Sequence, residues 1–305
     1  MEHVSVLLKE TISALAPVAR RVVVDCTVGA GGHAQALLES MPSGAVLVGL
    51  DMDGEAVTQA GERLAGFGPR VRLVRANFSQ VAGLLAGMGY DQVDALLADL
   101  GFSSSQLADP RRGLSFERDG PLDMRLDATS GPTAADLLNN LPEAELADLL
   151  YMESQERGSR IIARRIGERR RRAPLASTLE LARLVADAVG RRSAGRRIHP
   201  ATRTFLALRR AVNRETEALA ALLRQAPGLL RPGGRIAVIS FQSMEDRQVK
   251  EEFRRQARAG VYRVLTARPI RAAEAERREN PRSRSARLRV AERVDGGLAG
   301  AVPRR

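Results

Sequence analysis

The chain is poor in the residues that build disulfide-bonded, zinc-binding or aromatic-rich proteins. It has one cysteine, Cys26, no tryptophan, and 3% aromatic residues among 305. A single cysteine excludes an internal disulfide framework and a cysteine-rich zinc site, and is typical of the reducing cytoplasm. No apolar run approaches the roughly 20 residues that cross a bilayer, and the first ten residues lack the layout of a signal peptide. We therefore expect a cytoplasmic protein with no membrane partner and an aliphatic core.

Histidine and lysine are also scarce. The three histidines are His3, His33 and His199, and no two of them have the spacing of metal ligands, so no metal site is expected. Lys9 and Lys250 are the only lysines, so nearly all of the 48 basic side chains are arginines.

The positive charge is unevenly distributed. Residues 1–100 hold 7 basic and 11 acidic side chains, whereas residues 101–305 hold the other 41 and 25. The net charge of +12 therefore arises downstream of the first third. A polyanion, most simply a nucleic acid, is the expected partner, although a compositional bias toward arginine would produce the same excess.

The first hundred residues alternate between strand and helix patterns. Short aliphatic runs rich in β-branched residues alternate with helical segments of about ten residues. This order predicts an α/β fold with a parallel, doubly wound, Rossmann-like sheet and right-handed crossovers. The expected strands are 21–25, 45–50, 71–75 and 93–98, and the expected helices are 31–39, 55–65 and 79–88.

The alternation then stops, and a helical segment is expected before the strand pattern returns. Helices are predicted over 134–141, 143–151, 159–171 and 178–189, with Thr178 as the N-cap of the last. A long amphipathic helix over 201–224 follows, then strands 234–240, 261–266 and 286–291 and a helix over 245–256. We expect an α/β domain in two parts, 1–105 and 199–294, an inserted helical domain, 106–198, and a disordered tail, 295–305.

A glycine-rich loop follows the first expected strand. The run Asp25–His33, DCTVGAGGH, opens a helix, and its glycines let the backbone approach a ligand closely. Asp51 ends the second strand, where a carboxylate can accept both ribose hydroxyls of an adenosine. NAD, FAD and S-adenosylmethionine would each fit this arrangement.

Three features favour S-adenosylmethionine over a dinucleotide. Ala34 stands where the third glycine of a dinucleotide-binding loop would be. Asp25 precedes the loop, where it would repel a pyrophosphate but could receive a cationic amino-acid group. Phe78 follows the third strand, where its ring could pack on an adenine. A glycine turn without a ligand is the remaining alternative.

The fourth strand delivers Asp99 into a glycine-serine loop, which is how open α/β sheets build ligand sites at their carboxyl ends. A dense polar run follows that contains Asp119, Asp123 and Asp127. These carboxylates suggest acid–base catalysis, but ion pairs with neighbouring arginines that shape a loop are the favoured interpretation.

Together these residues resemble the bacterial RsmH (MraW) methyltransferases over nearly the whole chain. DCTVGAGGH, DGPLDMR (119–125), HPATRTF (199–205) and NPRSRSA (280–286) carry the resemblance. It implies a class I methyltransferase domain with an inserted helical domain, and N4-methylation of a cytosine of 16S ribosomal RNA near the decoding centre of the small subunit. The cofactor contacts that it implies are Gly31, Gly32, His33, Asp51, Phe78, Asp99 and Gln106.

The sequence departs from the family pattern in two motifs. Leu206 replaces a glutamine after HPATRTF, and Gln242 and Met244 replace a histidine and a leucine after the strand 234–240. Leu206 loses an amide, and Gln242 loses a titratable ring but keeps hydrogen-bonding atoms. A non-catalytic ribosome-assembly factor that keeps the cofactor pocket is therefore one alternative. A DNA amine methyltransferase is another, disfavoured because Asp99-Leu100-Gly101-Phe102 does not match a D-P-P-Y-like motif.

The expected catalysis is mainly alignment, because the cofactor supplies the driving force. Asp99 is the candidate for orienting the cofactor or the amine. Arg203 and Asn213 are expected on one side of the helix 201–224, and Asn213 is a second catalytic candidate. Two segments with eight arginines each, 157–172 and 268–289, are expected to contact RNA phosphates.

Overall fold

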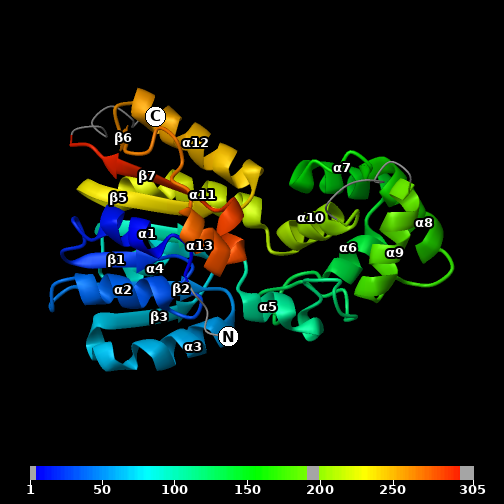
Figure 1. The fold of residues 1–305 in the computed structure, drawn as a ribbon, viewed down its shortest axis with the longest axis horizontal. Coiled ribbons are helices and arrows are strands. Elements are labelled where there is room, and N and C mark those ends of the chain that lie inside the picture. The colour runs from blue at the N-terminus through cyan, green and yellow to red at the C-terminus, as the bar shows by residue number, and fades with distance from the viewer. Residues whose placement is uncertain (1–4, 191–198, 296–305) are drawn as a thin grey trace. The chain divides into compact units, whose positions relative to one another are not determined.

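The computed structural model describes residues 5–190 and 199–295, apart from the side chains of residues 104 and 105. These residues form two compact units (Figure 1), which divide after Gly101 and after Thr216: the first contains the described residues of 1–101 and 217–305, and the second those of 102–216. The units divide at residues other than those expected from the sequence. The predicted boundary at 198 and nearly all of the predicted disordered tail, 295–305, lie outside the described residues.

The first unit is built on a mixed sheet. Its described residues form seven strands in the order β3-β2-β1-β4-β5-β7-β6. The pairs from β3 to β5 are parallel as predicted, whereas β7 runs antiparallel to both β5 and β6. The strands are β1 (Val22–Asp25), β2 (Val46–Asp51), β3 (Val71–Arg75), β4 (Val93–Asp99), β5 (Leu230–Ser240), β6 (Tyr262–Val264) and β7 (Arg287–Arg293).

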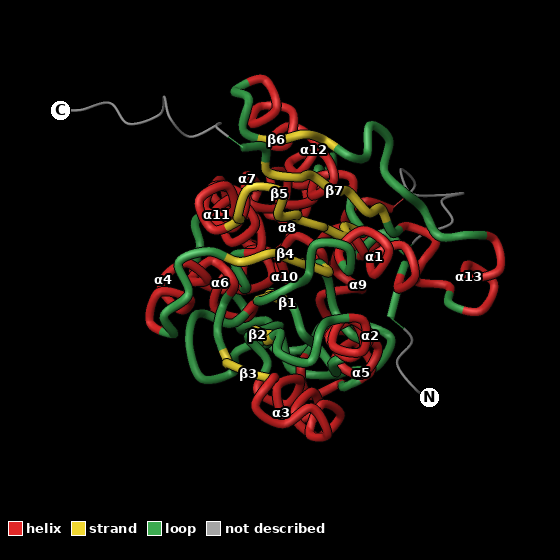
Figure 2. Tube along the Cα trace, turned by 90° about the vertical axis from the view of Figure 1, so that its left-hand side faces the viewer, coloured by secondary structure: helices red, strands yellow, loops and turns green. Residues whose placement is uncertain are grey.

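Helices cover both faces of this sheet, and Figure 2 shows the strands between them. Val22 and Val24 of β1 belong to one core cluster, and Val23 belongs to another, because successive side chains point to opposite faces. The first cluster packs against α4 (Val81–Gly87), α11 (Glu215–Leu229) and α12 (Ser243–Arg258). The second packs against α1 (Leu8–Leu15), α2 (Gly32–Ser40) and α3 (Gly54–Leu64). A short helix, α13 (Glu274–Glu279), precedes β7.

The second unit is helical and has its own core. That core includes Leu138, Leu150, Ile162 and Leu208, all fully buried. Ser177 caps α9 by accepting a hydrogen bond from the Glu180 N–H, so the prediction of Thr178 as the N-cap is wrong by one residue. The helices are α5 (Ser104–Ala108), α6 (Ala134–Asn140), α7 (Glu143–Ser154), α8 (Ser159–Arg170), α9 (Thr178–Val189) and α10 (Thr202–Val212).

The predicted helix over 201–224 is two helices. α10 ends at Val212, and α11 begins at Glu215. Between them Arg214 adopts a left-handed conformation with φ of 51°, and Asn213 is the C-cap of α10. The apolar stripe continues through this break, which is why the periodicity alone suggested one helix. α10 belongs to the helical unit rather than to the α/β unit.

Candidate cofactor site and the polar loop of the helical unit

The glycine loop lies at the carboxyl end of β1. Gly29 and Gly31 have φ of 51° and 82°, values that L side chains rarely adopt. The Gly29 N–H donates to Asp51 Oδ2 at 3.0 Å, and the Asp53 N–H donates to Asp51 Oδ1 at 3.0 Å. Asp51 thus joins the loop after β1 to the loop after β2. Burial raises the pKa of Asp51 to about 6.

Asp25 and Asp99 end two neighbouring strands, β1 and β4. Thr27 joins their loops, because its N–H donates to Asp25 Oδ1 at 3.1 Å and its Oγ1 accepts from the Asp99 N–H at 2.7 Å. Burial, and the negative charge of Asp25, raise the pKa of Asp99 to about 8. Burial also raises the pKa of Asp25 to about 7.

Each of these two carboxyl groups keeps an oxygen without a partner. Asp25 Oδ2 and Asp99 Oδ1 are buried and accept no hydrogen bond from the described residues. A buried polar atom without a partner is costly, so such atoms commonly mark a ligand site. A ligand with cationic or N–H groups would satisfy both oxygens, and this fits the ammonium and sulfonium of the expected cofactor.

His33 lies in the first turn of α2, directly after the glycine loop, and is buried. Its Nδ1 lies 3.7 Å from Asp99 Oδ2, and its Nε2 lies 3.0 Å from the carbonyl oxygen of Val6. Because a carbonyl only accepts, Nε2 carries a hydrogen. His33 therefore presents Nδ1 toward a carboxyl group of the candidate site.

Phe78 lies after β3, at the same edge of the sheet. It is partly buried and packs against the core cluster shared with α4 and α11. The order β3-β2-β1-β4 places the carboxyl ends of these parallel strands side by side. The edge thus carries Phe78, Asp51, Asp25 and Asp99 in that order. Hydrogen bonds tie Asp51 to the glycine loop, and the His33 ring at the end of that loop faces Asp99.

Gln106 and Asn213 belong to the helical unit. Gln106 is buried, and its side-chain oxygen accepts from the Ser103 N–H at 2.8 Å. Asn213 donates both amide hydrogens, to the carbonyl oxygens of Met124 and Arg209, each at 2.8 Å. Its Oδ1 accepts from the Leu126 N–H at 2.8 Å. The predicted cofactor contact of Gln106 and the predicted catalytic role of Asn213 stay predictions.

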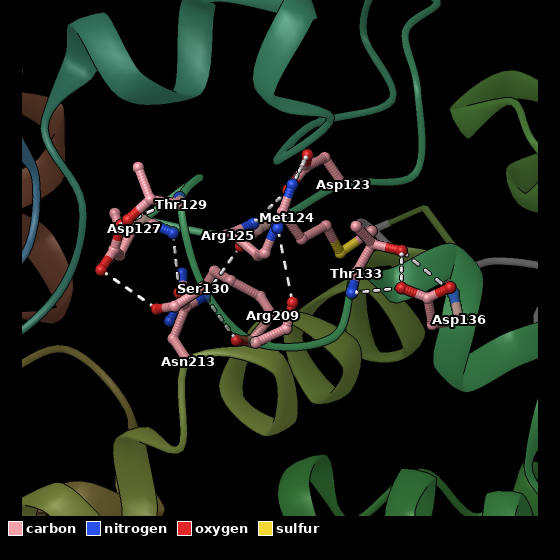
Figure 3. Close-up of polar contacts among 12 residues, drawn as sticks. Asp123, Met124, Arg125, Asp127, Thr129, Ser130, Thr133, Asp136, Arg209 and Asn213 are labelled. Carbon is pink, nitrogen blue, oxygen red and sulfur yellow. Dashed lines mark hydrogen bonds and ion pairs between the residues drawn. The ribbon is translucent and has the colours of Figure 1, made fainter.

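These bonds of Asn213 hold in place the polar loop that follows the 3₁₀ turn Pro110–Arg112 (Figure 3). Met124 adopts φ of 62°, with its side chain fully buried. Asp123 forms a two-point ion pair with Arg125, with both oxygen–nitrogen distances at 2.8 Å. Asp127 accepts from the Thr129 N–H at 3.0 Å. Asp123 thus has the arginine partner that the favoured interpretation expected, and Asp127 accepts hydrogen bonds within the same loop.

Asp119 also accepts hydrogen bonds that hold the backbone in place. It accepts from the Ser177 hydroxyl and from the Leu179 N–H, at the start of α9. Gly113 and Gly120 lie so close to the backbone of Pro121 and Pro110 that a Cβ on either would overlap a carbonyl oxygen. Close backbone approach explains why the motif DGPLDMR and its neighbourhood contain these glycines.

The sequence did not single out Thr27, Val6 or Asp53 as members of the site. Thr27 lies within the loop DCTVGAGGH, but its bond to Asp99 spans 72 residues. Val6 contacts His33 through a backbone carbonyl, which leaves no residue-type signal. Leu206 and Gln242, which depart from the family pattern, are not among these contacts. Leu206 is half-buried in α10, and the Gln242 N–H donates to Glu245 at the start of α12.

Potential metal ligands are scattered rather than clustered. In residues 5–190 and 199–295, no group of three or more histidine, cysteine or acidic side chains could hold a metal ion. Nor does the described part of the chain contain a helix with the length and apolar character needed to span a membrane.

Comparisons of sequence with known proteins agree on one family. Residues 1–294 match the model of the MraW methylase family. A ribosomal RNA small subunit methyltransferase H from Syntrophobacter fumaroxidans is 46% identical over 308 residues, which cover 96% of this chain and 97% of that protein. The protein of the same name from Sorangium cellulosum is 49% identical over 298 residues, covering 98% and 93%. The crystal structure of an rRNA methylase from Streptococcus thermophilus compares with this chain at a TM-score of 0.43 and 12% sequence identity. The comparison covers 96% of this chain and 99% of that protein.

Proposed function

Because the chain belongs to the MraW methylase family, we propose that it transfers a methyl group from S-adenosyl-L-methionine to N4 of a cytosine in 16S ribosomal RNA, near the decoding centre of the small subunit. The single observation that carries the site assignment is the pair of buried, unpartnered oxygens on Asp25 and Asp99. Small ribosomal subunits or their RNA are the proposed substrate, which makes the cytoplasm the proposed location.

Different residues of the first unit would contact different parts of the cofactor. Bound S-adenosylmethionine supplies the activated methyl group. Asp25 and Asp99 would receive its cationic amino-acid part, and Asp51 would accept from the ribose hydroxyls. Gly31 and Gly32 let the backbone approach, and Phe78 would pack on the adenine. Gln106 stays in the proposed set on the strength of the family motif.

The chain's contribution to the reaction is alignment and the handling of one proton. A cytosine amine is a weak nucleophile, because its lone pair is delocalised into the ring, so an acceptor for its N4–H would favour the reactive geometry. Asp99 is the proposed acceptor or orienting group. Its pKa of about 8 keeps a fraction of the carboxyl ionised at neutral pH, and only that form accepts without donating. Asn213 is the second candidate, but it would first have to open a hydrogen bond of the polar loop.

Exposed arginines support an RNA substrate. Each predicted arginine segment contains four exposed arginines whose side chains form no hydrogen bond or ion pair with the described residues. They are Arg157, Arg160, Arg171 and Arg172 in the helical unit, and Arg268, Arg271, Arg277 and Arg284 in the α/β unit. Free guanidinium groups are suited to bind phosphates. The target base must be unstacked to be reached, since A-form grooves hide its amine from side chains.

The test is methyl transfer from labelled S-adenosylmethionine to small ribosomal subunits from a strain that lacks this gene, with mass spectrometry of the nucleosides. We expect N4-methylcytosine from the wild-type protein, and a loss of at least about a hundredfold in rate for Asp99→Ala, the size of a lost positioning or acid–base group. Asp91→Ala, at an exposed carboxylate before β4, is the matched control and should keep full activity.

Other outcomes would contradict the proposal in different ways. Intact cofactor binding without any transfer would favour the non-catalytic assembly factor. Transfer to DNA rather than to subunits would favour the DNA amine methyltransferase. The expected outcome, N4-methylcytosine in the subunit RNA, would support the proposal and would show in addition that Leu206 and Gln242 are compatible with catalysis.

A further inference from the structure

A turn at residues 5–7 packs directly on the glycine loop of the first unit. Val6 and Leu7 are buried in the core cluster that also contains α2. A Cβ added at Gly32 would overlap Ser5 Oγ, so the turn and the loop are in close contact. The Val6 carbonyl oxygen accepts from His33 Nε2 at 3.0 Å. The turn therefore contacts two residues of the candidate cofactor site, Gly32 and His33.

The backbone of this turn is in an unfavourable conformation. Leu7 adopts φ of 53° and ψ of 36°, in the left-handed region. This conformation is unfavourable for a residue with a side chain, so local preference does not stabilise the turn. Such a conformation persists where surrounding contacts hold it.

One contact that holds the turn comes from the other end of the chain. The Leu7 N–H donates to Glu276 Oε1 at 2.8 Å, and Glu276 lies in α13, 269 residues away. The carboxylate fixes the N–H of the left-handed residue. The same peptide group carries the Val6 carbonyl that faces His33. A continuous set of bonds thus runs from Glu276 through the Val6–Leu7 turn to His33, whose Nδ1 faces Asp99 at 3.7 Å.

We propose that Glu276 is a positioning residue of the cofactor site, which acts through the Val6–Leu7 turn on the orientation of the His33 ring beside Asp99. The proposal rests on the proposed function for the identity of the cofactor only. Without the Glu276 carboxylate, the turn is free to leave the left-handed conformation. The Val6 carbonyl then moves away from Nε2, and the ring that faces Asp99 loses its fixed orientation.

The first readout is the affinity for S-adenosylmethionine, measured by titration calorimetry without RNA. Glu276→Ala removes the acceptor, and we expect it to weaken binding about fivefold to tenfold, the factor for one net hydrogen bond. Glu276→Asp keeps the charge but withdraws the carboxylate by one methylene, so it should weaken binding similarly. Glu276→Gln keeps an acceptor oxygen at the same reach and should restore wild-type affinity. Glu279→Ala, at an exposed glutamate of the same helix, is the matched control.

The second readout is the nitrogen NMR spectrum of the histidines. The chain has only three, so His33→Asn identifies the signals of His33. We expect a protected Nε2–H signal in the wild type, Glu276→Gln and Glu279→Ala, and its loss or shift in Glu276→Ala and Glu276→Asp. A role of Glu276 in α13 alone would leave the His33 signals unchanged.

The outcomes separate this inference from the proposed function. Unchanged His33 signals in Glu276→Ala, or equal affinities for Glu276→Ala and the wild type, would overturn the role of Glu276. A wild-type protein that does not bind S-adenosylmethionine would overturn the proposed function, and the histidine spectra would still decide whether Glu276 holds the ring.

Discussion

Asp25 is buried and Asp51 and Asp99 are partly buried, and none of these three carboxyl groups forms an ion pair with an arginine or lysine among the described residues. Burial is the largest cause of the raised pKa of each, which is about 7, 6 and 8 respectively. Aspartate in an unfolded chain has a pKa near 3.8. A site that keeps carboxyl groups in this state is built at the expense of stability, as functional sites commonly are.

These raised pKa values predict an inverted dependence of stability on pH. Between about pH 4 and pH 8 the folded protein binds protons on Asp25 and Asp99 that the unfolded chain has released. Their contribution to the free energy of unfolding is therefore complete below about pH 4 and is lost as the pH rises through 7 and 8. We expect the cofactor-free protein to melt several degrees lower at about pH 8.5 than at about pH 5.5.

The Asp99→Asn variant tests the assignment of this effect. Asparagine does not titrate, so the fall in melting temperature over the same interval should be clearly smaller than in the wild type. Asp91→Asn changes an exposed carboxylate and should follow the wild-type curve. If the Asp99→Asn and wild-type curves are parallel, Asp99 is not a source of the pH dependence.

At the scale of single elements, the break between α10 and α11 offers a clean comparison. Arg214 and Arg203 are both exposed arginines whose side chains bond to none of the described residues, but Arg214 is left-handed and Arg203 lies inside α10. Arg214→Gly should raise the free energy of unfolding by up to about 1 kcal/mol, because glycine avoids the penalty of roughly 1–2 kcal/mol and costs less than that in entropy.

Arg203→Gly removes the same charge but should lower the free energy of unfolding. Glycine in a helix interior costs about 1 kcal/mol relative to good helix formers, and the cost at Arg203, in the first turn of α10, should not exceed that value. Chemical denaturation of both variants measures the difference directly. A destabilised Arg214→Gly would mean that the Arg214 side chain itself stabilises the junction between the two helices.

The same break shows which elements the sequence could predict. β3 and α9 lie where predicted, at 71–75 and 178–189, because an apolar run and a helical period each end at local polar signals. The end of α10 depends instead on Asn213, whose partners Met124 and Leu126 lie more than 80 residues away. The reversed direction of β7 is likewise set by pairing with β5 and β6, which no local pattern encodes.

The candidate site follows the same rule. Glycines after β1 and acidic residues at strand ends are local signals, and they predicted a ligand site with Asp51 and Asp99; Gly31 and Gly32 as contacts are what the family resemblance implies. The contacts that join these residues through Thr27, Val6 and Glu276 span up to 269 residues. Motifs therefore predicted which residues lie at this edge of the sheet, and only the fold shows how they are held; their contact with a cofactor stays a prediction.

At the scale of the whole molecule, the net charge overstates the charge available to a partner. Arg170 donates to the carbonyl oxygens of Leu138 and Leu141, both at 2.7 Å, and Arg289 forms an ion pair with Asp246 at 2.6 Å. Such arginines stabilise the two units. The eight exposed and unpaired arginines of the two arginine segments remain available to a polyanion, and they lie in both units.

Binding to RNA should therefore depend on particular arginines rather than on net charge. The double variant Arg171→Ser, Arg172→Ser and the double variant Arg268→Ser, Arg271→Ser should each lower affinity for small-subunit RNA and reduce the slope of log K against log salt. The slope should fall by about 0.7–0.9 for each phosphate that the variant no longer neutralises. Arg164→Ser, Arg165→Ser removes the same charge from residues already paired with Glu168, and should change the slope less. Fluorescence anisotropy over a salt series measures the slopes. If the slope falls equally in all three variants, the charge acts as a diffuse field. If the slope stays at the wild-type value in all three, these arginines are excluded from the RNA interface.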